Sequence, residues 1–177
     1  MNLFSSHKLT TAWIDCFFKE ANVSLSKELT ARIRKYNKQK RPIIFLCIGT
    51  PAVVGDSLGP VVGTILKDHG IADVFGTLDA PVHALNLEGY IEAIKEKYES
   101  PFIIAIDAAL GNVNQSGFIT VKKGPLLPGK GVGKNLSPVG NLHITGVVNH
   151  LYKNYLTDLI LDYSHCISRS ILQMYES

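Results

Sequence analysis

Two uninterrupted apolar runs stand out along the chain, Ile43 to Ile48 and Phe102 to Ile106. Short apolar runs bounded by turn residues are typical of strands that are buried on both faces, as in a parallel sheet. Each run leads to an aspartate: Asp107 follows the second run directly, and Asp56 follows the first through a turn rich in glycine and proline. Because burying an unpaired carboxylate is costly, two aspartates in such positions indicate a functional site.

Helical periodicity, in which apolar residues recur every three or four positions, marks much of the remaining chain. The helices expected from it are, in order, a short one around Thr11–Glu20, one from Ser24 or Ser26 to Tyr36, Leu58–Asp68, Asn86–Tyr98, and a mostly helical stretch over Ile144–Tyr175 with a break near 152–157. Shorter strands are expected over Asp73–Leu78 and over Gly117–Lys123, whose polar and apolar residues alternate as at a sheet edge. Strands alternating with helices predict a layered α/β fold with a largely parallel sheet.

The length of 177 residues fits one domain, with a helical lead-in over 1–41, a core over 42–150 and a C-terminal helix over 151–177. Hydrophobic residues make up 46% and charged residues 19% of the chain, which excludes a disordered protein. A net charge of +3 is too small to indicate nucleic-acid binding. The one basic cluster, Arg32 to Arg41, ends a predicted helix, where the helix dipole favours cations; a surface for an acidic partner is the lesser alternative.

Cysteine spacing and hydropathy bear on metal sites, disulfides and cellular location. Cys16, Cys47 and Cys166 are widely spaced without a C-x-x-C pair, so the sequence predicts neither a zinc site nor a disulfide framework. No apolar run reaches the length of a membrane span, and the N-terminal segment does not resemble a signal peptide. The sequence therefore predicts a cytoplasmic protein.

Two motifs, one typical of nucleotide binding and one of serine hydrolases, are only partly present in the sequence. Gly124 to Lys130 has the spacing of a phosphate-binding loop, but Gly131 stands where serine or threonine would bind magnesium. The segment is better interpreted as a loop bordering the carboxylate site. Ser57 lies beside Asp56 without the G-x-S-x-G surroundings of a serine hydrolase.

Paired carboxylates have two established chemical uses. At close range one of them holds a proton, and the pair can activate water as acid and base. Alternatively both ionise and bind a divalent metal, with a third ligand from His143, which follows the glycine loop, or from His83 or Glu88. The structural alternatives are that Asp56 caps the helix after it and that the second aspartate closes a turn.

The motifs Gly55–Pro60, Ala105–Ala108 and Pro128–Gly133 resemble, in this order, those of the spore germination proteases. They are closer still to those of the YyaC-like group of small sporulation proteins. More distantly, the layout is similar to that of the hydrogenase maturation proteases, and this resemblance implies a three-layer α/β/α fold. Germination proteases are much longer chains with a removable propeptide, so the resemblance implies the fold and the carboxylate pair more directly than peptide cleavage.

Residue by residue, the resemblance implies that Asp56 and Asp107 correspond to the catalytic aspartates of an atypical, acid-dependent protease. Its substrates would be the small acid-soluble proteins that coat DNA in dormant spores, which implies a forespore or spore-core location. In hydrogenase maturation proteases, acidic residues near these positions and a histidine bind nickel. A divalent metal such as nickel or zinc at Asp56, Asp107 and His143 is accordingly the alternative to a cofactor-free site.

The leading prediction is a peptidase-like sporulation protein whose two aspartates activate water. Thr50, Ser57 and the backbone amides of Gly129, Gly131 and Gly133 are expected to orient the substrate or support the oxyanion. One alternative is a non-catalytic protein that recognises a peptide or a metal of its partner. Another is a metal-dependent hydrolase on the same fold.

Overall fold

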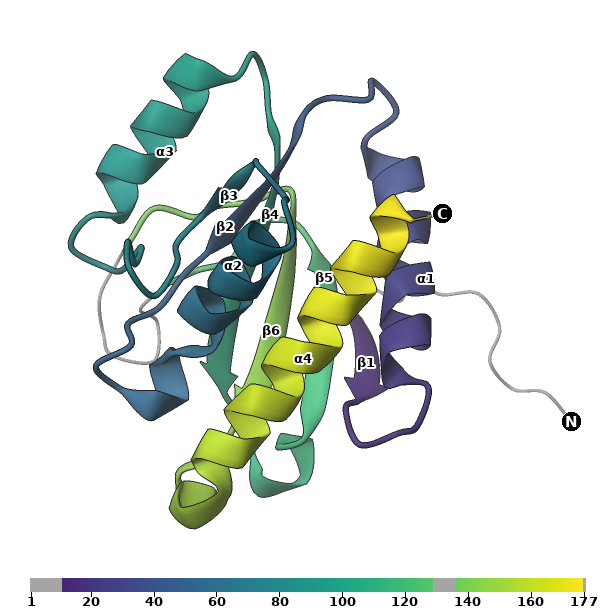
Figure 1. The fold of residues 1–177 in the computed structure, drawn as a ribbon, viewed down its shortest axis with the longest axis vertical. Coiled ribbons are helices and arrows are strands. Elements are labelled where there is room, and N and C mark those ends of the chain that lie inside the picture. The colour runs from purple at the N-terminus through teal and green to yellow at the C-terminus, as the bar shows by residue number, and fades with distance from the viewer. Residues whose placement is uncertain (1–10, 129–135, 177) are drawn as a thin grey trace, which may run out of the picture.

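A computed structural model describes residues 11–128 and 136–176, which form a six-stranded sheet with helices on both faces (Figure 1). The strands lie in the order β1-β5-β6-β4-β2-β3. Their bounds are β1 Thr11–Asp15, β2 Ile43–Cys47, β3 Val74–Phe75, β4 Phe102–Leu110, β5 Phe118–Lys123 and β6 Leu142–Val148. Strands β3, β2, β4 and β6 are parallel, while β5 runs antiparallel to β6 and β1. The three-layer α/β/α fold with a largely parallel sheet is thus confirmed.

Three helices cover one face of the sheet and one helix covers part of the other. The helices are α1 Ala21–Tyr36, α2 Leu58–Asp68, α3 Leu87–Lys97 and α4 Leu156–Tyr175. Helices α1, α2 and α4 share one hydrophobic cluster with residues such as Phe45 and Ile106, whereas α3 packs on the opposite face against residues such as Leu46. Strands β2 and β4 are therefore buried on both sides, which explains their uninterrupted apolar runs. Among the described residues, no helix is long and apolar enough to cross a membrane.

Helix α2 starts where the sequence predicts, and its first turn lies directly against β2. Pro60 occupies that turn, where its missing N–H group leaves no helical hydrogen bond unmade. Gly59 lies so close to the strand that a Cβ atom on it would be 2.1 Å from the Ile48 carbonyl oxygen. This close contact holds the loop between β2 and α2, which includes Asp56, over the end of the sheet.

Two segments predicted as helices are strands. The beginning of the supposed C-terminal helical stretch is β6, which inserts between β4 and β5, and the segment predicted as a helix from Thr11 begins with β1. Because β1 pairs along its whole length with β5, β5 is not the sheet edge that its alternation predicts. Strand preference depends on such neighbours more than on local sequence, so short segments are easily misassigned. The predicted break near 152–157 overlaps a 3-10 turn, His150–Tyr155, that leads into α4.

Candidate active site at the carboxyl edge of the sheet

Asp56 is held by the turn that follows β2. Gly49 makes this turn with a φ of +142°, and a Cβ atom on it would lie 2.0 Å from the Asp56 carbonyl oxygen. Only glycine permits such an approach. The Thr50 N–H group then donates to both the carbonyl oxygen and the carboxylate Oδ2 of Asp56, each at 3.0 Å. The loop therefore folds back on itself and fixes the Asp56 carboxylate over the end of the strand.

This geometry excludes Asp56 as the cap of α2. The N-cap position belongs to Ser57, and neither side chain forms a capping hydrogen bond to the helix. The Ser57 hydroxyl instead donates to the Val54 carbonyl oxygen at 2.7 Å, and the Thr50 hydroxyl accepts the N–H group of Ala52 at 3.3 Å. Both predicted substrate-binding side chains are thus engaged within the loop that positions Asp56.

Asp107 lies within β4 rather than at its end, because the strand continues to Leu110. It is therefore not a turn residue. The side chain is 9% exposed, and its Oδ1 accepts the N–H group of Ala108 at 2.7 Å. A carboxyl group thus projects from the middle of a buried strand with a single hydrogen bond to described residues.

The environments of the two aspartates push their pKa values apart. Burial raises the pKa of Asp107 well above its ordinary value, and the negative charge of Asp56 raises it further. Burial also raises the pKa of Asp56, but the N–H group of Thr50 and the nearby His83 lower it. The structure therefore brings the two predicted carboxylates into one electrostatic unit. Because the pKa of Asp107 is raised more strongly, this arrangement favours ionisation of Asp56 before Asp107.

A row of polar side chains extends from Asp107 across the sheet. Thr145 on β6 pairs with Asp107 on one side and with Thr120 of β5 on the other. Directly paired residues of neighbouring strands share one face of a sheet, so the three side chains lie side by side. Both threonines are buried, and their hydroxyl oxygens are 2.7 Å apart. Thr145 escaped the sequence analysis because its strand was predicted as a helix, whereas the alternation around Thr120 was a usable signal.

His143 lies on the same strand as Thr145, about 7 Å further from the carboxyl edge at the usual strand rise. Its Nδ1 forms a hydrogen bond with the Gly124 carbonyl oxygen at 2.9 Å, and burial together with nearby Lys122 lowers its pKa. Within 11–128 and 136–176, no group of three or more His, Cys, Asp or Glu side chains is placed to hold a metal ion. The described side chains, His143 included, thus contain no such group of three, and a metal bound at Asp56, Asp107 and His143 stays a prediction.

The glycine-rich loop is only partly described. Gly129, Gly131 and Gly133 lie outside the described residues, so their predicted contacts with substrate stay predictions. On either side of this gap, Leu126 and Val139 exchange backbone hydrogen bonds of 2.8 and 3.0 Å and bury their side chains beside α3. The described part of the segment, from Gly124 to Pro128, thus contributes Leu126 to an isolated β-bridge with Val139.

Exposed apolar side chains gather in the segments that follow the carboxyl ends of the parallel strands. They are Val53 and Val54 after β2, Leu85 after the Ile48–Val82 bridge, Leu110 and Val113 at the end of β4, and Leu151 and Tyr155 after β6. Figure 1 shows these ends of β4 and β6 at the lower edge of the sheet, beside the start of α4. We refer to these seven residues as the apolar rim. Exposed apolar groups gathered around a polar site are typical of surfaces that bind other molecules.

The sequence matches a recognised protein family. The family described as "Protein of unknown function (DUF1256)" matches residues 16–171, a range that includes both aspartates, and the chain belongs to it. The chain is also 42% identical over 149 residues to the uncharacterized protein YyaC of Bacillus subtilis (strain 168). That alignment covers 83% of this chain and 72% of the relative, which confirms the predicted membership of a YyaC-like family.

Proposed function

We propose that this protein is a peptidase in which Asp56 and Asp107 act as an acid–base pair on a peptide bond. The observation that supports this most directly is the contrast between the surroundings of the two carboxyl groups. A buried carboxyl group that keeps its proton lies in the field of a more exposed carboxylate held by the Thr50 amide. One acid and one base in a single site meet the requirement for hydrolysis without a covalent intermediate.

The environments of the two carboxyl groups support one division of roles. Asp56, which ionises first, accepts a proton from water as the water oxygen attacks the peptide carbonyl carbon. Asp107 donates its proton to the carbonyl oxygen and gives a neutral tetrahedral diol. As the C–N bond breaks, Asp56 transfers its proton to the leaving nitrogen and Asp107 recovers a proton from a diol hydroxyl. Water is consumed, and both aspartates return to their starting states.

The apolar rim is consistent with the proposal that the substrate is a polypeptide. Its exposed side chains extend over several loops around the carboxylates, and an extended peptide crossing this edge would bury part of them. Small acid-soluble spore proteins are the proposed substrates and the forespore or spore core is the proposed location. Both proposals rest on the resemblance to spore germination proteases.

A non-catalytic peptide-binding protein is the second candidate, because the same rim would serve binding without turnover. The test is incubation of the purified protein with small acid-soluble spore proteins between pH 4 and 8, with fragments identified by mass spectrometry. Asp56→Asn and Asp107→Asn are compared with Asp79→Asn, which alters an exposed loop carboxylate.

For a carboxylate-pair peptidase we expect defined cleavage that persists after chelator treatment. Each site variant should lower the rate by about 100-fold or more, and Asp79→Asn should not. Full activity in either site variant would refute the mechanism. Cleavage lost on chelation would indicate a metal-dependent hydrolase instead. Saturable binding without cleavage, weakened by the same two variants, would support the binding protein.

A further inference from the structure

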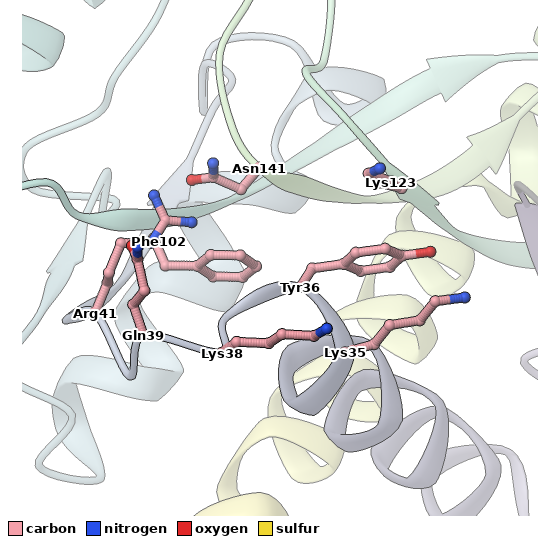
Figure 2. Close-up of a pocket in the computed structure, with 8 residues that line it drawn as sticks. All are labelled: Lys35, Tyr36, Lys38, Gln39, Arg41, Phe102, Lys123 and Asn141. Carbon is pink, nitrogen blue, oxygen red and sulfur yellow. The ribbon is translucent and has the colours of Figure 1, made fainter.

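A second site lies at the opposite edge of the sheet, where β4 and β6 begin. Here a pocket of about 370 Å³ opens between the end of α1 and the sheet. Phe102 is the first residue of β4, Asn141 precedes β6, Lys123 ends β5 and Tyr36 ends α1 (Figure 2). Asp107 lies five positions further along β4 than Phe102, about 16 Å at the usual rise, so the pocket is distinct from the carboxylate site.

The lining of this pocket is strongly basic. Its described lining contains four cationic side chains and no acidic one. The cations are Lys35, Lys38, Arg41 and Lys123, and the other lining residues are Tyr36, Gln39, Phe102 and Asn141. None of the four cations forms an ion pair with a described residue. Four positive charges thus gather in one pocket without a carboxylate to neutralise them, and their mutual repulsion favours a bound anion.

Two aromatic rings contact three of the four cations. The ammonium groups of Lys35 and Lys123 lie 5.3 and 4.9 Å from the centre of the Tyr36 ring, which Figure 2 shows between the two lysines. The Arg41 guanidinium lies 5.1 Å from the centre of the Phe102 ring. Such cation–π contacts restrain long side chains that would otherwise spread into solvent. The positive charges are therefore partly arranged before any ligand binds.

The end of α1 does not by itself explain this cluster. The helix dipole accounts for cations in the last turn, such as Lys35, but not for Lys123, which comes from a strand distant in the sequence. The shape also argues against a nucleic-acid groove, since the cations line one small pocket rather than a stripe, and the net charge of the chain is only +3. A compact ligand with at least two negative charges matches the lining best.

We propose that this pocket binds a diphosphate-bearing small molecule. Lysine ammonium groups are suited to phosphate as point charges, and a guanidinium can donate two hydrogen bonds to one phosphate group. Two adjoining phosphates offer a charge close to that of the four cations, which a single carboxylate does not. The inference is independent of the proposed peptidase activity.

The experiment is calorimetric titration of the full chain with pyrophosphate at low salt, repeated with inorganic phosphate. We expect one saturable site for pyrophosphate and binding about 10-fold weaker for phosphate. Lys38→Gln and Lys123→Gln should each weaken pyrophosphate binding about 5- to 10-fold. The matched control is Lys95→Gln, an exposed lysine on α3, which should bind as the wild type does. Circular dichroism melting identifies variants that fold normally.

Three results would overturn the proposal. The first is no saturable binding, with a Kd weaker than about 10 mM. The second is equal weakening by Lys95→Gln and Lys123→Gln, which would show a general charge effect. The third is tighter binding of duplex DNA or of a glutamate-rich peptide than of pyrophosphate, weakened by the same pocket variants. Asp107→Asn should bind pyrophosphate normally whether or not the protein cleaves peptides, so failure of one proposal is distinguishable from failure of the other.

Discussion

Replacing Asp107 by asparagine should stabilise the protein at neutral and alkaline pH. Because the pKa of this carboxyl group is raised in the folded state, the folded protein holds a proton there that the unfolded chain releases near its usual pKa of about 3.9. Between the two pKa values the folded state binds more protons, so its stability falls as pH rises. Asparagine cannot ionise, and this loss of stability should disappear.

The size of the effect follows from the contacts of the side chain. Asp107 is 9% exposed, and among the described residues its carboxyl group forms one hydrogen bond, in which Oδ1 accepts the N–H group of Ala108. The ionised group thus has little compensation within the described residues, and an uncompensated buried polar group costs about 1–3 kcal/mol. The variant should gain an amount of this order at pH 8 and almost nothing at pH 4. That gain is measurable against a typical domain stability of about 5–15 kcal/mol.

The assay is urea unfolding of wild type and Asp107→Asn at pH 4, 6 and 8, with Asp79→Asn as the control. The difference in unfolding free energy between Asp107→Asn and wild type should grow with pH, while that of the exposed control should stay flat. Some pH dependence should remain in Asp107→Asn, because burial also raises the pKa of Asp56. A variant no more stable than wild type at pH 8 would refute the assignment of a buried, protonated Asp107.

Three further predictions concern catalysis and packing. Peptidase activity should follow a bell-shaped pH profile, rising as Asp56 ionises above the ordinary carboxyl range and falling at higher pH as Asp107 loses its proton; rates on a fixed peptide measure both limbs. Thr120→Val and Thr145→Val should each cost about 1–3 kcal/mol in urea unfolding, and the double variant less than their sum, because each single change leaves one buried hydroxyl unpaired. Additive costs would contradict that pairing. Gly59→Ala should lower stability by about 1–3 kcal/mol or more, since its Cβ atom would collide with the strand backbone, and a melting temperature equal to wild type would exclude the contact.

The sequence alone determined the features that depend on local pattern. Strands β2 and β4 were predictable because burial on both faces requires an uninterrupted apolar run, and Ile43–Cys47 and Phe102–Ile106 supply it. The bounds of α2, Leu58–Asp68, followed from helical periodicity with proline in the first turn. The position of the two aspartates near the ends of these runs was sufficient to predict their meeting at one edge of a parallel sheet.

Only the tertiary structure decided which residues lie beside that pair. The segment from Ile144 is predicted as a helix from the sequence, yet it lies in β6 because β4 and β5 offer this strand hydrogen-bonding partners on both sides. That insertion places Thr145 beside Asp107 and aligns it with Thr120. The raised pKa of Asp107 and the clustering of cations around Tyr36 likewise depend on the tertiary structure. Burial and charge at a position depend on segments distant in sequence, and these become neighbours only when the chain folds.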